Sequence, residues 1–139
     1  MTAPQLAVKR STQAVNHIMK ASQVYLAIDL GAESGRVLAG EYDGNAITLN
    51  VVHSFPNGPI TLNGSIHWNT VGLFQQILEG LAKAQAKYGS SLQSIAVDSW
   101  GLDYGHLDSA GNLLGMPYHY RDSRTAPMFE KLFYEISRE

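Results

Sequence analysis

The chain has 139 residues, of which 45% are hydrophobic and 16% are charged, and it contains no cysteine. A sequence of this length and composition forms a globular domain that folds without a metal or disulfide staple. The lack of cysteine excludes disulfides, thiolate zinc sites and a cysteine nucleophile. A net charge of −2 gives no basis for binding nucleic acid or an acidic membrane, and no apolar run reaches the ~20 residues that span a bilayer. We therefore expect a cytoplasmic domain.

Residues 1–22 differ in composition from the rest. Lys9, Arg10 and Lys20 are not balanced by any acid, and Ala, Ser, Thr and Gln are frequent. Such a start is found in flexible terminal extensions and in organelle transit peptides. We expect residues 1–22 to be a flexible extension and residues 23–139 to form the domain.

Three strands are expected in succession, at residues 24–30, 36–42 and 46–55. The first is an apolar, partly β-branched run that ends at Gly31, which is typical of a buried strand. The third alternates apolar and polar residues, and the residues 43–45 before it favour a tight turn. Strands joined by such short turns predict an antiparallel meander.

A helix is expected after a loop at residues 56–67. Asn69 is a suitable N-cap, and Gly89 is a suitable stop. Glu79 and Lys83 are spaced to pair on the solvated side of this helix. Its apolar residues recur every three or four positions, which predicts a stripe facing the core: Leu73, Phe74, Ile77, Leu78, Leu81, Ala84 and Tyr88.

A second buried strand is expected at residues 94–98, followed by a hairpin with arms at residues 102–107 and 113–118. A last helix is expected from Ala126 to Glu139. Its apolar face would be formed by Met128, Phe129, Leu132, Phe133 and Ile136. Since the chain stops within this helix, we expect it to be the amino-terminal piece of a longer protein.

A glycine-rich turn after the first strand is a candidate ligand site. Asp29 closes the strand, and Gly31 and Gly35 let backbone N–H groups approach an anion. A carboxylate beside phosphates suits Mg²⁺, which Asp29 would hold through water. The candidate nucleotide-binding residues are Asp29, Gly31, Ala32, Glu33, Ser34, Gly35 and Arg36. The turn lacks the lysine of a P-loop and leads into a strand, so a plain hairpin turn is the alternative.

A second candidate site follows the strand at residues 94–98. Asp98 ends this strand, and ligands of open sheets bind beyond the carboxyl ends of strands. Trp100, Gly101 and Asp103 come next, and an aromatic face with nearby carboxylates suits a sugar ring and its hydroxyl groups. The alternative is that Trp100 belongs to the core and Asp103 to an exposed turn.

Arg121, Asp122 and Arg124 form a third cluster of functional side chains. We expect these residues either to fix their own loop through ion pairs or to contact a ligand. The five histidines show no paired spacing, so we expect no histidine metal site.

Four parts of the sequence share their order and spacing with one known family: residues 27–37, Trp68, residues 94–103 and residues 120–125. In these parts the chain resembles the amino-terminal domain of the FGGY carbohydrate kinases, most closely their rhamnulokinase branch. The resemblance extends over about residues 24–139. It implies an α/β fold of the ribonuclease H-like, actin-like ATPase type, with a mixed sheet and flanking helices, of which this chain holds an incomplete copy.

The resemblance also implies an enzyme that uses ATP and Mg²⁺ to phosphorylate the 1-hydroxyl group of L-rhamnulose or a similar ketose. The turn at residues 29–36 would be its first phosphate loop, with Asp29 on the Mg²⁺ side. Gly101 would lie at the sugar, Trp100 and Asp103 would line the same pocket, and Asp98 is a further candidate for binding substrate. Glu33 stands where relatives often have Ser or Thr, and we expect its side chain to point away from the nucleotide.

In this family the general base, the adenosine pocket and the second phosphate loop lie beyond the part that this chain resembles. The resemblance therefore implies a general base beyond Glu139 and no catalytic residue within the chain. Phosphoryl transfer depends on positioning and charge neutralisation across a closed cleft, so we expect no kinase turnover from this chain alone.

Two other functions are considered. One is a non-catalytic module that binds sugar or nucleotide. The other is a metal-dependent nuclease on the same fold, with Asp29 and Asp98 at its metal ions. The acidic net charge weighs against the nuclease.

Overall fold

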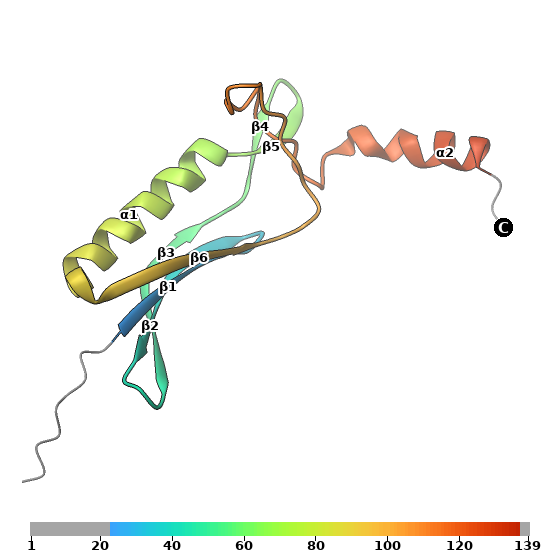
Figure 1. Cartoon of the computed structure of the whole chain (residues 1–139). Coiled ribbons are helices and arrows are strands. Elements are labelled where there is room, and N and C mark those ends of the chain that lie inside the picture. Colours follow the sequence, from blue (N-terminus) through green and yellow to red (C-terminus); the bar gives the residue numbers. More distant parts are fainter. Residues whose placement is uncertain (1–22, 137–139) are drawn as a thin grey trace, which may run out of the picture.

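The computed structural model describes residues 23–136, so the extension expected at residues 1–22 lies outside the described residues. These residues form a four-stranded sheet, a two-stranded hairpin and two α-helices (Figure 1). None of their helices is both long enough and apolar enough to span a membrane. The elements in chain order are β1 (Gln23–Leu30), β2 (Ser34–Tyr42), β3 (Ile47–Pro56), β4 (Pro59–Leu62), β5 (Ser65–Trp68), α1 (Thr70–Tyr88), the 3₁₀ turn η1 (Gly89–Ser91), β6 (Leu92–Ser99), the 3₁₀ turn η2 (Ser123–Thr125) and α2 (Ala126–Glu135).

The main sheet has the strand order β3-β2-β1-β6 and is mixed. β1, β2 and β3 pair in antiparallel fashion, which confirms the expected meander. β6 pairs with β1 in parallel, from Val24 beside Leu92 to Leu30 beside Ser99. A parallel neighbour cannot be reached by a tight turn, and the chain makes the crossover through β4, β5 and α1.

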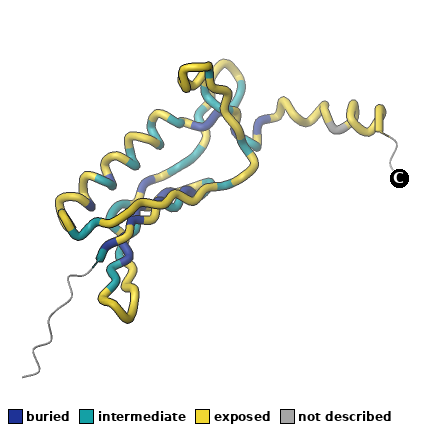
Figure 2. The backbone as a smooth tube through the Cα atoms, viewed as in Figure 1, coloured by how far each residue is buried: buried dark blue, intermediate teal, exposed yellow. Residues whose placement is uncertain are grey.

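The core lies between α1 and one face of the sheet (Figure 2). Alternate residues of β1, from Val24 to Leu30, are buried on this face. Two small residues of α1, Gly80 and Ala84, are its buried positions, and they let the helix backbone approach β2 and β3. Asn69 caps the helix by accepting from the Gly72 N–H group at 3.0 Å, and Gly89 follows its last turn, as expected.

The apolar stripe expected on α1 is wider than the surface that covers it. Phe74 is 60% exposed and Leu78 is 49% exposed, because α1 packs mainly on β2 and β3. The strand expected at residues 94–98 is confirmed as part of β6, but the expectation that it is buried is wrong within the described part of the chain. β6 is an edge strand there, and Ile95 and Val97 on it are 53% and 62% exposed.

The loop expected at residues 56–67 is instead the β4–β5 hairpin. Asn63 and Gly64 form its turn with φ angles of 52° and 80°, and an Asn-Gly pair with positive φ at both positions matches the twist of a two-residue hairpin. The Asn63-Gly64 pair is a local sequence signal for this turn. The strands on either side, β4 and β5, are only four residues long and were therefore missed.

The hairpin expected around residues 108–112 is reduced to a turn and a single bridge between Leu107 and Leu113. Its second arm pairs elsewhere. The Trp68 N–H group donates to the Pro117 carbonyl at 2.9 Å, and the His119 N–H group donates to the Ile66 carbonyl at 3.0 Å. Residues 117–119 therefore lie along β5, because β5 offers them backbone hydrogen bonds that the first arm does not.

α2 ends at Glu135, whereas the sequence predicts a helix that continues to Glu139. Residues 137–139 lie outside the described part. The general base is expected beyond Glu139, past the given sequence, so it stays a prediction. The helix projects away from the sheet (Figures 1 and 2). Met128 and Leu132 on its expected apolar face are 56% and 52% exposed, because no other described element covers them.

Replacing Gly80 with Ala tests how closely α1 approaches β2. A Cβ atom there would lie 2.4 Å from Cγ2 of Val37, a fully buried, β-branched side chain that cannot move aside. Although Ala is the better helix former by about 1 kcal/mol, we expect Gly80→Ala to lower the free energy of unfolding by about 1–2 kcal/mol through overpacking. Urea denaturation measures this, with Gly115→Ala as the control because its Cβ would meet no atom within 4 Å. A Gly80→Ala chain as stable as the parent would contradict the packing.

Candidate functional site

Three charged side chains lie in one row across the end of the sheet. Asp29 on β1 is paired in register with Asp98 on β6 and with Arg36 on β2. Register partners on neighbouring strands point to the same face, and for Asp29 this is the face opposite the buried residues of β1. Arg36 Nη2 lies 2.9 Å from Asp29 Oδ2. The sheet thus brings together the two carboxylates that belong to the two expected sites.

The turn between β1 and β2 is tightly held at its base. The Gly31 N–H group donates to the Ser34 carbonyl at 2.9 Å, and Asn57 donates from its side chain to the Gly31 carbonyl at 2.7 Å and from its backbone to the Glu33 carbonyl at 3.0 Å. The Gly31 N–H group is therefore not available to an anion. The N–H groups of Ala32 and Glu33 at the tip have no acceptor within residues 23–136.

Gly31 and Gly35 were expected to let backbone N–H groups approach an anion, and the structure gives them other roles. Neither has a positive φ angle. A Cβ atom on Gly35 would lie 2.2 Å from the ring of Phe55, so this glycine serves packing of the turn on β3. Ser34 and Glu33 are exposed. Among the seven candidate nucleotide-binding residues, Ala32 and Glu33 offer free backbone donors, and Arg36 offers a cation next to them.

Asp29 and Asp98 are the candidate groups for a divalent cation. No cluster of three or more His, Asp or Glu side chains suited to a metal occurs in the described part of the chain. Mg²⁺ usually keeps several waters and needs one or two carboxylates beside substrate phosphates. This pair of adjacent carboxylates fits that requirement, although Arg36 already engages one oxygen of Asp29.

The second candidate site is centred on the carboxylate of Asp103. Its Oδ2 atom accepts two hydrogen bonds from indole N–H groups, from Trp68 at 2.6 Å and from Trp100 at 2.9 Å. Asp103 is half-buried, and Trp100 packs against the core residues around Phe55. Trp100 is therefore partly a core residue, and Asp103 is not an exposed turn residue.

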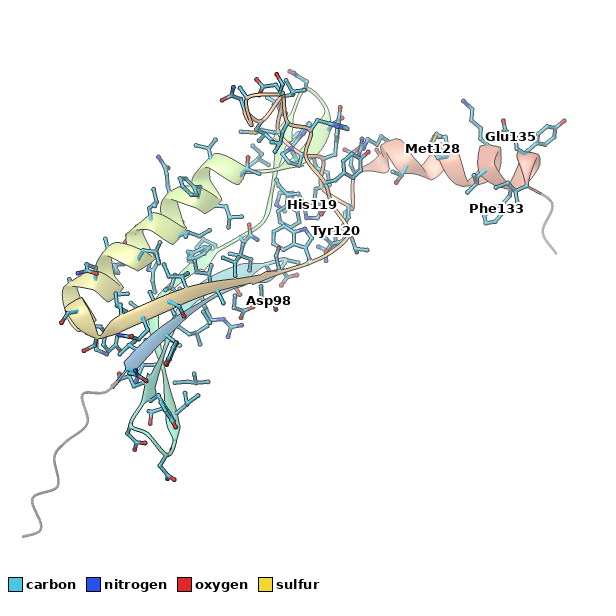
Figure 3. All side chains as sticks on the ribbon, in the orientation of Figure 1. Asp98, His119, Tyr120, Met128, Phe133 and Glu135 are labelled. Carbon is cyan, nitrogen blue, oxygen red and sulfur yellow. The ribbon has the colours of Figure 1, made fainter. Side chains whose placement is uncertain are left out.

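Four aromatic rings stack beside this carboxylate. Ring centroids are 4.0 Å apart for Trp68 and Trp100, 4.1 Å for Trp68 and His119, and 4.4 Å for His119 and Tyr120. His119 and Tyr120 lie side by side between Asp98 on the sheet and the start of α2 (Figure 3). Neither Trp68 nor His119 was expected as a site residue from its own chemistry. The pairing of residues 117–119 with β5 brings them there, and no local sequence pattern signals it.

His119 is held in one orientation. Its side chain is 2% exposed, and its Nδ1 atom accepts from the Arg121 N–H group at 3.0 Å. The neutral ring therefore carries its proton on Nε2, which has no partner in the described residues. Burial lowers the pKa of His119, since the charged ring would lose its hydration. Thr70 Oγ1 is likewise buried without a partner among the described residues.

Two hollows open beside Asp103. One has a volume of about 360 Å³ and is lined by Asp103, Tyr104, His119, Tyr120, Arg124 and Thr125 among others. The other, of about 190 Å³, is lined by Trp68, Thr70, Ser99, Trp100 and Asp103 among others. A Cβ atom on Gly101 would meet no atom within 4 Å. The loop after β6 thus leaves space beside polar groups that lack partners within residues 23–136.

The third cluster fixes its own loop. Asp122 is 6% exposed and accepts from the backbone N–H groups of Ile66 at 2.8 Å and Arg124 at 3.0 Å. These donors lower the pKa of the Asp122 carboxyl. The Arg124 guanidinium lies 3.7 Å from the centroid of the Tyr118 ring, whereas Arg121 lies over Tyr120 and makes no ion pair with Asp122 in the described part.

The chain is similar in sequence to rhamnulokinases. It is 40% identical over 116 residues to that of Bacteroides thetaiotaomicron, which covers 84% of this chain and 24% of the relative. It is 46% identical over 102 residues to that of Yersinia pestis, covering 72% of this chain and 21% of the relative. The chain therefore spans about a quarter of the length of these relatives. No family model matches it.

Solved structures of carbohydrate kinases share its fold. The gluconate kinase of Lactobacillus acidophilus matches with a TM-score of 0.66 and 16% identity, over 82% of this chain and 23% of that one. The glycerol kinase of Plasmodium falciparum, solved with ADP, matches with a TM-score of 0.61 and 16% identity, over 84% and 24%. The expected mixed-sheet, actin-like ATPase fold and the resemblance to carbohydrate kinases are confirmed.

The buried, neutral His119 predicts that the chain loses stability in mild acid. The lowered pKa means that the unfolded chain binds a proton at His119 below about pH 6.5 while the folded chain does not. Stability present above that pH is therefore lost as the pH falls below it, whereas Asp122, also with a lowered pKa, acts below about pH 4.

We expect the melting temperature to fall between about pH 7 and about pH 5.5, and His119→Phe to reduce that fall. His106→Phe is the control, because His106 is exposed and should leave the fall unchanged. Equal pH dependence in the parent and in His119→Phe would show that this ring does not stay neutral through burial.

Proposed function

We propose that this chain is the amino-terminal part of an ATP-dependent kinase that phosphorylates the 1-hydroxyl group of L-rhamnulose or a similar ketose. The observation that carries the proposal is the register between β1 and β6, which places Asp29 beside Asp98. It sets the turn of the expected phosphate loop and the loop of the expected sugar site at one edge of the sheet. The similarity to a rhamnulokinase over 84% of the chain supports this choice of reaction.

The nucleotide side of this site would be formed by residues 29–36. The N–H groups of Ala32 and Glu33 would donate to phosphate oxygens. Arg36 would leave its 2.9 Å contact with Asp29 to face the phosphates, since Mg²⁺ brings its own positive charge to the carboxylate. A magnesium ion held beside Asp29 would supply positive charge to neutralise the charge that develops on the transferred phosphoryl group.

The sugar side would be formed by Gly101, Trp100, Asp103 and Asp98. The space at Gly101 admits a ring that a larger side chain would displace, and carboxylate oxygens accept from sugar hydroxyl groups. The general base is expected beyond Glu139, so these residues bind and orient the sugar and move no proton themselves. The chain alone would then bind its ligands without turnover. None of the relatives described above is a nuclease, so that alternative gains no support.

A chimera tests the reaction. Residues 23–136 replace the matching segment of the Bacteroides thetaiotaomicron rhamnulokinase, and ADP release is measured with L-rhamnulose. We expect the chimera to be active and the 139-residue chain alone to release no ADP above background. We expect Asp29→Asn in the chimera to lower kcat by about a hundredfold, because the carboxylate that holds Mg²⁺ would be lost.

The matched control is Asp43→Asn, at an exposed aspartate whose Oδ1 accepts from the Asn45 and Ala46 N–H groups far from the site. Its amide oxygen can replace that acceptor, so activity should not change. A chimera that folds and is inactive, or one that Asp29→Asn leaves fully active, would contradict the proposed nucleotide side.

Gly101→Glu tests the sugar side. Because nothing lies within 4 Å of the new Cβ and φ is not positive, the free energy of unfolding should change by no more than about 0.5 kcal/mol. In the chimera the KM for L-rhamnulose should rise at least about tenfold, a cost of about 1.4 kcal/mol, while the KM for ATP stays the same. Gly115→Glu, also in open space, is the control, and an unchanged KM for the ketose in Gly101→Glu would remove Gly101 from the sugar site.

A further inference from the structure

Trp68 and Trp100 are the two tryptophans of the chain, and both donate to the same oxygen of one carboxylate. The two N–H groups reach Asp103 Oδ2 at 2.6 Å and 2.9 Å, and the two rings stack at 4.0 Å. Hydrogen bonds to an ionised acceptor are about twice as strong as those between neutral groups. The indole pair therefore fixes both the position and the orientation of the Asp103 carboxylate.

This contact joins segments that are distant in the sequence. Trp68 ends β5 and is 2% exposed, so it belongs to the rigid part of the structure. Trp100 and Asp103 lie in the loop after β6, which contains no regular secondary structure. Between them Gly101 has no side chain, and Leu102 is 76% exposed. Within residues 100–103, the hydrogen bond that Asp103 accepts from Trp68 is the side-chain hydrogen bond to another element among the described residues.

We propose that Trp68 is a positioning residue of the ketose site, which fixes the loop at residues 100–103, and Gly101 with it, by donating a hydrogen bond to Asp103. The proposal rests on the proposed function, because it takes this loop as the sugar-binding one. Asp103 Oδ1 accepts no hydrogen bond within the described residues, and Asp103 lines both hollows. The two indoles hold Oδ2, and Oδ1 is left as the acceptor for a sugar hydroxyl group.

Trp68→Phe in the full 139-residue chain separates the N–H group from the ring. Phenylalanine keeps an aromatic face against Trp100 and His119 but donates nothing to Asp103. The spectroscopic readout is the Trp100 indole N–H resonance, which is the one indole signal left in this variant. We expect its exchange with water to become at least about tenfold faster, because the loop opens locally more often.

The second readout is binding of L-rhamnulose, followed through the backbone amide of Gly101. We expect the Kd to rise at least about tenfold in Trp68→Phe. Asp103→Asn keeps an oxygen that can accept from the indoles but replaces the second oxygen with a donor. We therefore expect Asp103→Asn to weaken ketose binding while it leaves Trp100 indole exchange closer to that of the parent.

Tyr88→Phe is the matched control. It also removes one aromatic donor to a carboxylate, the 2.8 Å bond from Tyr88 Oη to Glu41 Oε1, but at the opposite end of α1. It should reduce stability and leave both the Kd and the Trp100 exchange rate unchanged. If Trp68→Phe behaves like Tyr88→Phe in both readouts, Trp68 has a structural role alone and the positioning role is overturned.

The two levels of the proposal fail in different ways. If the parent chain binds L-rhamnulose and Trp68→Phe does not weaken this binding, the positioning role is overturned and the proposed function stays intact. A parent chain that binds no L-rhamnulose overturns the positioning role together with the assignment of the sugar. The activity of the chimera then decides the kinase reaction independently.

Discussion

The parallel pairing of β1 with β6 governs how the whole chain is arranged. Because the two strands run side by side in the same direction, the loops that follow them begin at the same edge of the sheet, with Asp29 beside Asp98. A parallel partner requires a crossover, and the crossover consists of the β4–β5 hairpin and α1. The candidate phosphate turn and the candidate sugar loop are thus neighbours because of strand direction, although about seventy residues separate them.

The position of α1 decides which parts of the sheet are covered. Gly80 and Ala84 bring the helix close to β2 and β3, so the β6 side keeps Ile95 and Val97 exposed, and Phe74 and Leu78 of α1 are exposed as well. Burial of such side chains contributes about 1.5–3 kcal/mol each. The relatives, about four times longer, have further chain that could cover such a surface.

Buried polar contacts determine the shape of the candidate sugar side. Asp103 and Asp122 are acceptors around which segments from different parts of the chain converge: Trp68 and Trp100 on Asp103, and the Ile66 and Arg124 backbone on Asp122. An unpaired buried donor or acceptor costs about 1–3 kcal/mol, so these carboxylates restrict the loops to arrangements that keep the donors around them paired. Thr70 Oγ1 and His119 Nε2 have no partner within residues 23–136, and both residues border the hollows beside Asp103.

Local sequence patterns were sufficient to predict most of the elements, whereas the roles of the two sets of site residues stay predictions. The periodicity of β1 and α1, the Asn69 cap and the Gly89 stop are local properties, so the meander and the helix were predicted close to their observed bounds. Contacts between distant residues settled the rest. The pairing of residues 117–119 with β5 turned an expected hairpin into a single bridge, and it brought Trp68 and His119 to Asp103. The placement of α1 left the expected buried strand at residues 94–98 exposed at an edge. The burial of a side chain and the pairing of two segments depend on which surfaces meet in space. The spacing of residues along the chain does not indicate which surfaces these are.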